Sequence, residues 1–207
     1  MVGLGCKNCC CEREDYVVVN GVKWAKYNIS TPGNFAKDSA DVGMFYQWNR
    51  NVGWIWDAKN KKPIPSVLGV IWNSSPDTCS NYEKWKEWSD SVCPKGWRLP
   101  TFSEIKSLIG VGSFQGTLNG VEGNFFVGDS SICSINNNVL LFLPFGTLSE
   151  KIGDPYRSMN TYGNIWGMPD TSLIKEAYSM GYHNGAASWA SKFENRAKGF
   201  YVRCVKD

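Results

Sequence analysis

The chain has 207 residues, enough for one domain, or one domain with a short tail, to bury a core without the help of a metal ion. A formal net charge of +3, with Lys and Arg spread along the chain, is too small to indicate a nucleic-acid partner. The sequence has no apolar run of the roughly 18 residues that a membrane-spanning helix needs. Ten Trp, nine Tyr, ten Phe and 21 Gly favour irregular loops anchored by aromatic side chains over a helical bundle.

Four of the eight cysteines crowd the start of the chain, at Cys6, Cys9, Cys10 and Cys11. We expect residues 1–15 to form a disordered, Cys-rich tail and residues 16–207 to form a single domain. One alternative is the remnant of a lipoprotein signal, in which Cys6 would carry a lipid anchor. A zinc site is the minority alternative, because a closed site needs four ligands and no second closely spaced Cys pair follows. We predict no metal and no cofactor.

The first half of the chain predicts mainly short strands. Residues 16–19 and 22–27 read as two strands joined by a primed turn at Asn20-Gly21. Residues 28–62 show no consistent period and are predicted to be irregular, with a solvated loop at 59–63. Residues 67–72 form a short apolar run that predicts a further strand.

Two capping boxes predict two helices. Ser80-x-x-Glu83 precedes aromatic residues at helical spacing, which predicts a helix over about residues 81–91. Thr101-x-x-Glu104 predicts a second helix that begins at Phe102, and Gly110 is a natural stop for it.

The second half is less regular. A glycine-rich passage covers 110–128, and the apolar run 139–145 predicts a central strand. Residues 151–198 are mixed and show no strong period, whereas 199–205 alternate as a half-buried strand does. This order predicts an α+β domain with two helices, an antiparallel sheet, adjacent N- and C-terminal strands and long irregular loops.

Three segments resemble a known family. They are Gly21-Val22-Lys23-Trp24-Ala25, Cys93-Pro94-Lys95-Gly96-Trp97-Arg98-Leu99-Pro100-Thr101, and the ending Val202-Arg203-Cys204-Val205. The sequence resembles the Fibrobacter succinogenes major paralogous domain of Bacteroidetes surface proteins. That domain is similar in turn to the C-type lectin-like fold of formylglycine-generating enzymes and of the variable proteins made by diversity-generating retroelements.

The resemblance implies a C-type lectin-like fold, a cell-surface, extracellular or phage-displayed location, and a disulfide between Cys93 and Cys204. Two buried free thiols remain the alternative at those positions. Looser matches are Leu141-Phe142-Leu143-Pro144-Phe145-Gly146 and Tyr162-Gly163-Asn164-Ile165-Trp166. After the second of these, Gly167-Met168 stands where the family usually has two serines.

Sequence signatures of catalysis are weak. The only histidine, His183, lies in Gly181-Tyr182-His183-Asn184-Gly185, which reads as an exposed turn. An oxidase of the formylglycine-generating type would need a cysteine pair near the C-terminus, and only Cys204 is there. Met168-Pro169-Asp170 also lacks the first oxygen ligand of a calcium-dependent sugar site. We therefore predict no enzymatic activity.

The C-terminal region 156–196 concentrates the residue types of binding loops, with Tyr and Trp as anchors and Ser, Asn and Gly as adaptable partners. The resemblance implies variable, ligand-binding positions in this same region. The candidate site residues are Tyr162, Asn164, Trp166, Asp170, Tyr182, His183, Asn184, Ser188, Trp189, Asn195 and Arg196. For Trp166 and Trp189 the alternative is an anchor in the core.

The predicted function is therefore adhesin- or receptor-type binding of a protein or glycan ligand by loops diversified by a retroelement. The alternatives are an enzyme related to the formylglycine-generating oxidases, and a structural subunit of a surface appendage or phage particle.

Overall fold

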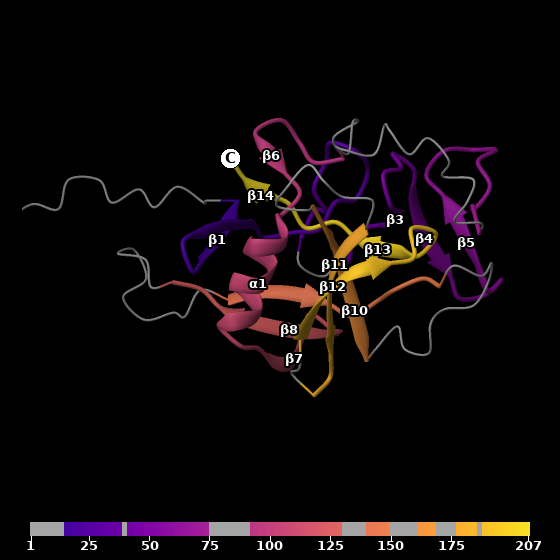
Figure 1. Ribbon diagram of the computed structural model, residues 1–207. Helices are drawn as coiled ribbons and strands as arrows, with labels where there is room; N and C mark the ends of the chain where they lie inside the picture. The colour runs from indigo at the N-terminus through magenta and orange to yellow at the C-terminus, as the bar shows by residue number, and fades with distance from the viewer. Residues whose placement is uncertain are drawn as a thin grey trace, which may run out of the picture.

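The computed structural model describes residues 15–38, 41–74, 92–129, 140–149, 161–168, 177–185 and 188–207. Over these residues the chain forms three β-sheets and one helix (Figure 1). The four-stranded sheet has the order β1-β2-β14-β6, from Tyr16–Val19, Val22–Ala25, Val205–Lys206 and Trp97–Arg98. The three-stranded sheet has the order β7-β8-β9, from Phe114–Leu118, Val121–Val127 and Leu140–Pro144.

The largest sheet has seven strands in the order β12-β11-β10-β13-β3-β4-β5. In that order the strands are Ser188–Glu194, Ala177–His183, Tyr162–Gly167, Gly199–Tyr201, Phe45–Gln47, Gly53–Asp57 and Lys62–Pro65. All its pairings are antiparallel except that of β10 with β13. The C-terminal part of the chain thus pairs directly with β3, which is far away in sequence.

The predicted α+β, C-type lectin-like fold with two helices is wrong. The protein is mostly β-sheet, and the described residues contain one short helix, α1 (Phe102–Gly110). The other predicted helix, over 81–91, lies outside the described residues, as do most of the predicted tail and Asp170. The prediction failed because much of the chain that showed no period, including 151–198, supplies strands of a large sheet.

Helix α1 begins and ends where its sequence predicts. The Thr101 hydroxyl accepts a hydrogen bond from the Glu104 amide at 3.2 Å, and the Glu104 carboxylate accepts one from the Thr101 amide at 2.7 Å. Arg98 clamps the same carboxylate with two hydrogen bonds, of 2.7 and 2.8 Å. Burial of the carboxyl raises the pKa of Glu104, but the bonds from Arg98 and Thr101 outweigh it, and the pKa falls below its usual 4.5.

Several predicted strands differ from the observed ones. β1 and β2 form the predicted hairpin around Asn20-Gly21, both of which have positive φ. The predicted strand at 67–72 is wrong, because the chain turns there and Gly69 has φ +83°. The Gly-rich passage after α1 instead forms the hairpin β7–β8, and β9 lies at the edge of its sheet instead of at the centre.

The end of the chain is also more complex than one alternating strand. β13 joins the seven-stranded sheet, while β14 pairs with β2 and β6 in the four-stranded one. Between them, Val202, Arg203 and Cys204 are all buried, so the predicted half-buried alternation is wrong. The Cys204 sulfur is bonded to that of Cys93, with the Cα atoms 6.0 Å apart, as the resemblance implied.

Arg203 is the polar centre of this region, which we call the C-terminal anchor (residues 202–205). Its guanidinium is almost fully buried. It donates hydrogen bonds to the Asn28 side chain at 2.7 Å and to the carbonyls of Ala25, Lys26 and Phe142 at 2.5–2.9 Å. Burial lowers its pKa to about 9. One side chain thus ties three distant segments together through acceptors that carry no charge.

Candidate functional site

The face of the seven-stranded sheet formed by β10, β11 and β12 carries the candidate site. In this part of the sheet Asn164 pairs with Gly181, and Gly181 pairs in turn with Trp189. Side chains of directly paired residues project from the same face of a sheet. The three positions therefore form one row across three strands, with a gap in the middle where glycine has no side chain.

Trp189 fills part of that gap. A Cβ built on Gly181 would overlap the Trp189 indole, so the ring lies directly against the glycine backbone. Trp189 is nevertheless 39% exposed. Gly181 therefore fixes the position of the ring, while the rest of the indole stays open to solvent.

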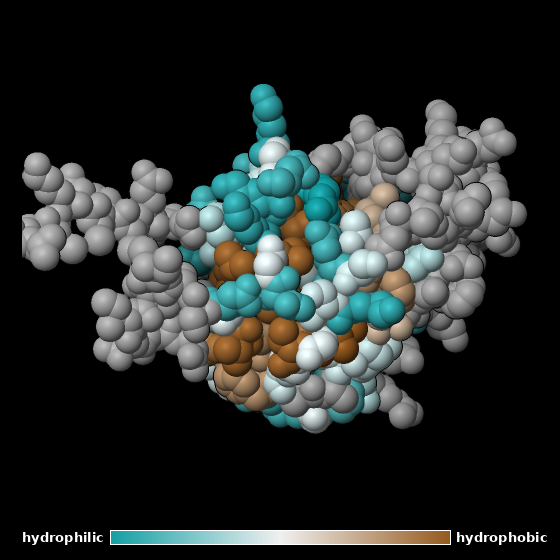
Figure 2. Space-filling model, turned by 60° about the vertical axis from the view of Figure 1, so that its left-hand side comes forward, coloured by the Kyte–Doolittle hydropathy of each residue, from teal (hydrophilic) through white to brown (hydrophobic). Residues whose placement is uncertain are grey.

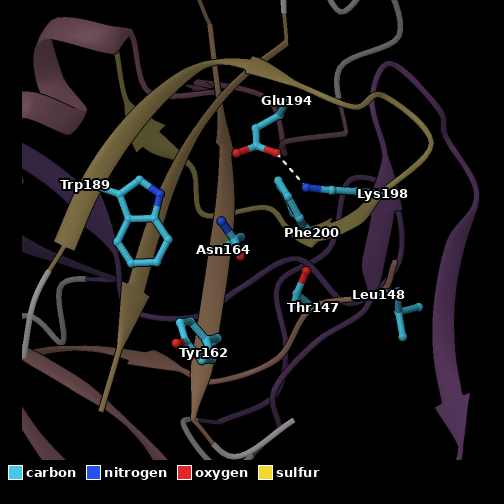
Figure 3. Close-up of a pocket in the computed structure, with 8 residues that line it drawn as sticks. All are labelled: Thr147, Leu148, Tyr162, Asn164, Trp189, Glu194, Lys198 and Phe200. Atoms are coloured by element: carbon cyan, nitrogen blue, oxygen red, sulfur yellow. Dashed lines mark hydrogen bonds and ion pairs between the residues drawn. The ribbon is translucent and has the colours of Figure 1, made fainter. Parts of the chain in front are cut away.

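Beside this row lies a pocket of about 310 Å³ (Figure 3). Its walls come from β10, β12, β13 and the segment that follows β9. The lining residues are Thr147, Leu148, Tyr162, Asn164, Trp189, Glu194, Lys198 and Phe200.

Thr147 and Leu148 reach the pocket because the chain after β9 runs along the sheet. The Gly146 amide donates to the Tyr162 carbonyl at 2.6 Å, and Leu148 and Gly199 exchange two backbone hydrogen bonds, of 2.8 and 2.9 Å. Gly146 has φ +149°, and an added Cβ would overlap the Tyr201 side chain. Only glycine fits there, and it delivers Thr147 to the pocket.

Two polar side chains of the pocket have no hydrogen-bond partner in the described part of the chain. Asn164 is 8% exposed and Thr147 is 4% exposed, yet no described residue bonds to the Asn164 amide or the Thr147 hydroxyl. Figure 3 shows Asn164 between Trp189 and Phe200, with the Thr147 side chain close by. Neither group is among the described side-chain atoms that are fully enclosed and lack a partner, so both are accessible from the pocket. Water pairs with them when the pocket is empty, and a bound molecule with donors and acceptors can take its place.

The charged residues of the pocket neutralise each other. Lys198 donates to the Glu194 carboxylate at 3.0 Å, and both side chains are largely shielded from solvent. A turn between β12 and β13 sets this pair: the Asn195 side chain accepts from the Ala197 amide, and the Asn195 carbonyl accepts from the Lys198 amide. The pair offers oxygen acceptors and N–H donors without a net charge.

Three aromatic rings cluster at the pocket, two of which line it. Tyr162, which is 40% exposed, lies 5.6 Å from the His183 ring and 6.4 Å from the Trp189 ring, measured between centroids. His183 and Trp189 are 6.0 Å apart. The His183 Nδ1 accepts from the Gly185 amide at 2.9 Å, which orients the imidazole. These rings form a partly exposed aromatic rim.

The structure brings Tyr162, Asn164 and Trp189 together in the pocket, with His183 beside them. Asn184 is exposed in the turn after β11, where its amide donates to the Thr161 carbonyl at 3.0 Å. Ser188 is half-buried at the start of β12, and its hydroxyl has no partner among the described residues.

Two candidates belong to the core and not to a ligand surface. Tyr182 is fully buried on the opposite face of β11, where its hydroxyl donates to the Pro144 carbonyl at 2.7 Å. Trp166 is also fully buried: its indole N–H donates to the Tyr46 carbonyl at 2.6 Å, and its ring packs on Phe200 at 4.2 Å. For Trp166 the alternative interpretation, an anchor in the core, is therefore correct. The exposed turn that the sequence predicted around Tyr182 is wrong, because Tyr182 lies near the end of β11.

Asn195 and Arg196 serve the turn that carries the ion pair. Asn195 bonds within this turn, and the Arg196 carbonyl accepts from the Trp48 amide at 3.1 Å. Neither lines the pocket.

Sequence reasoning missed five of the lining residues: Thr147, Leu148, Glu194, Lys198 and Phe200. Thr147 and Leu148 enter through a backbone contact with Gly199, some 50 residues away, which no local pattern reveals. The alternation Tyr178-Ser179-Met180-Gly181-Tyr182 was the available signal for β11, since its large residues all face the core.

A second, more open depression lies beside α1. It is lined by Phe102, Lys106, Ile109, Gly110 and Ala190. Figure 2 turns the α1 side toward the viewer and shows hydrophobic residues gathered mainly in the lower half of this face. No polar side chain among the lining residues is buried without a partner, so this depression has less of the character of a binding site.

The chemistry available elsewhere is limited. Cys204 is fully buried and bonded to Cys93, so it has no free thiol of the kind that an oxidase needs. The described residues contain no group of three or more His, Cys, Asp or Glu that could hold a metal ion. Within the same residues, no helix combines the length and the apolar character required to cross a membrane.

Comparison with known proteins gives no relative: no family model, no curated protein and no solved structure matches this chain. The function proposed below therefore depends on the geometry of the pocket.

Proposed function

We propose that the chain is a non-catalytic binding module and that the pocket between β10, β12 and β13 is its ligand site. One observation carries the proposal: the side-chain polar groups of Asn164 and Thr147 have no partner in the described chain and are accessible from a pocket with an aromatic rim. Concave sites with a few convergent polar groups and aromatic walls are typical of ligand binding. The rigid sheet below holds these groups in place before a ligand arrives.

The disulfide supports a location outside the cytoplasm. Bonds of this kind persist in oxidising compartments and are rare where thiols are kept reduced. We therefore place the module at the cell surface, free outside the cell or on a phage particle, consistent with the surface-protein family that the sequence resembles.

Diversification by a retroelement remains part of the proposal, but we limit the variable positions to those candidate residues that are exposed. The exposed candidate residues Tyr162, Asn184 and Trp189 can change without loss of the core. Tyr182 and Trp166 cannot, because both are buried and hydrogen-bonded. Sequencing the same locus across strains tests this: substitutions confined to the exposed set support diversification, and substitutions that fall equally on both sets contradict it.

Ligand binding itself is tested by 19F NMR on protein labelled with 5-fluorotryptophan. The chain has ten tryptophans, so the Trp189 signal is assigned from its disappearance in Trp189→Phe. A mixed library of glycosides, short peptides and small polar organic compounds is then screened. We expect at least one class to shift the Trp189 signal while that of the fully buried Trp24 stays fixed. If no compound shifts Trp189, the proposed site is wrong.

A further inference from the structure

The pocket chemistry narrows the class of ligand, on the basis that the proposed binding function holds. A volume of about 310 Å³ is at the small end of known ligand pockets, which span roughly 300–1,000 Å³. It accommodates one small ring and does not accommodate a helix or a strand of a protein partner.

The electrostatics disfavour a charged ligand. Glu194 and Lys198 are already paired at 3.0 Å, so the lining has no uncompensated charge among its residues. A cation or an anion would have to break that pair and would lose its own hydration without a full partner.

The unpaired polar groups disfavour a purely apolar ligand. Such a ligand would leave the Asn164 amide and the Thr147 hydroxyl without hydrogen bonds and without access to water. An amide offers two donors and one acceptor, and a hydroxyl both donates and accepts. The matching ligand carries several groups that donate and accept at once, which is the property of a polyol.

The exposed indole of Trp189 provides an apolar contact for the ligand. The face of an indole is negatively polarised, and it attracts the weakly positive C–H bonds of a saturated ring that carries electron-withdrawing oxygens. Trp189 is held against Gly181, so its ring is positioned before binding and loses little freedom.

We propose that the pocket binds a single neutral pyranose unit of a glycan. The C–H face of the sugar packs on Trp189, while its hydroxyls bond to Asn164, Thr147 and the Glu194 carboxylate. No metal ion takes part, which separates this site from the calcium-dependent sugar sites considered for the sequence.

The test titrates methyl glycosides of common neutral hexoses and N-acetylhexosamines into 5-fluorotryptophan-labelled protein. We expect at least one of them to shift the Trp189 signal, with Kd in the millimolar range that suits one weakly held ring, about 1 mM. Addition of the chelator EDTA should leave the titration unchanged. Trp189→Ala should abolish binding as followed by saturation-transfer NMR of the glycoside.

Matched variants separate recognition from folding. Thr147→Val removes the hydroxyl at nearly constant shape and should weaken binding about fivefold, whereas Thr147→Ser keeps the hydroxyl and should stay within about twofold. Asn164→Leu should weaken binding at least as much as Thr147→Val. Ile55→Ala changes an exposed side chain on β4 of the same sheet and should leave binding unchanged. Unshifted Trp24 and Trp166 signals verify the fold of each variant.

The outcomes distinguish this proposal from the broader one. If no glycoside shifts Trp189 but peptides or other compounds do, the sugar assignment is wrong and the pocket remains a ligand site. If a glycoside binds equally well to Thr147→Val and Asn164→Leu, the site is elsewhere and the assignment of these residues is overturned. If nothing in either screen shifts Trp189, both proposals fall.

Discussion

Two regions of this protein contain largely buried polar side chains, and they differ in whether those side chains are hydrogen-bonded within the chain. In the C-terminal anchor, Arg203 is buried and makes four hydrogen bonds to neutral acceptors, all within the chain. In the pocket, Asn164 and Thr147 are buried almost as deeply and bond to no described residue. The contrast is between a polar group whose hydrogen bonds are all made within the fold and two polar groups that are accessible from a pocket, where a ligand can reach them. Burial alone does not distinguish the two.

The largest expected effect is at the anchor. Arg203→Met removes all four hydrogen bonds and leaves three backbone carbonyls without a donor, so the free energy of unfolding should fall by about 3 kcal/mol or more. Urea denaturation followed by tryptophan fluorescence measures the loss. Lys95→Met, at an exposed position, is the control and should change stability little. A loss below about 1 kcal/mol would show that water replaces the guanidinium without cost, and would remove the contrast with the pocket.

A smaller effect separates the two faces of the sheet. Tyr182→Phe deletes the hydroxyl that donates to Pro144 and should cost about 1–1.5 kcal/mol, because the carbonyl loses its buried donor. Tyr162→Phe, at the exposed position of the neighbouring strand, should cost less than about 0.5 kcal/mol. Thermal denaturation of both variants compares them directly. Equal losses would contradict the assignment of Tyr182 to the core and Tyr162 to the site.

The Arg98–Glu104 ion pair makes a pH-dependent contribution to the free energy of unfolding. The folded pKa of Glu104 lies below its usual 4.5, so the stabilisation is present above that pH and is lost as the pH falls through the folded pKa. Glu104→Gln should cost about 1 kcal/mol at pH 7, a modest value because Arg98 is partly exposed. At pH 3 the variant and the wild type should differ less. A difference that stays constant from pH 7 to pH 3 would mean that the charge of Glu104 contributes nothing.

The smallest expected effect on stability is in the pocket. Asn164→Leu and Thr147→Val remove polar groups that have no partner in the described chain, so the free energy of unfolding should change by less than about 0.5 kcal/mol or even rise. The same variants should weaken ligand binding. A large loss of stability would show that these groups support the fold, and the pocket would then resemble the anchor.

Much of the local structure could be predicted from the sequence because the signals were local. The capping box at Thr101 and Glu104 and the Asn20-Gly21 turn depend on residues within a few positions of each other, and both lie where the sequence indicates. The candidate residues Tyr162, Asn164 and Trp189 followed from residue type, since aromatic and amide side chains are common in binding sites, and from the region that the family resemblance implied.

The β-sheet fold and the assembly of the pocket from distant segments could not be predicted from local sequence signals. β10, β11 and β12 lie in a chain segment without a strong period, because both faces of β10 and β11 are buried: Trp166 and Ser179 on one face are as buried as Ile165 and Met180 on the other. Only the pairing of β13 with β10 and β3 assembles the large sheet. Sequence patterns report which face of one element is apolar, and they do not report which distant element will cover the other face.

What the sequence by itself determined is the start and end of α1, the first hairpin and the kinds of side chain available for binding. Only the tertiary structure decided which of these side chains line the pocket and which enter the core. Gly181, between Asn164 and Trp189, leaves room for the Trp189 indole. Gly146 brings Thr147 into the same pocket from another part of the chain. Tyr182, one residue from Gly181, turns into the core because successive residues of a strand face opposite sides. Local chemistry fixes short-range geometry, whereas a pocket is a property of segments that meet only when the sheet is complete.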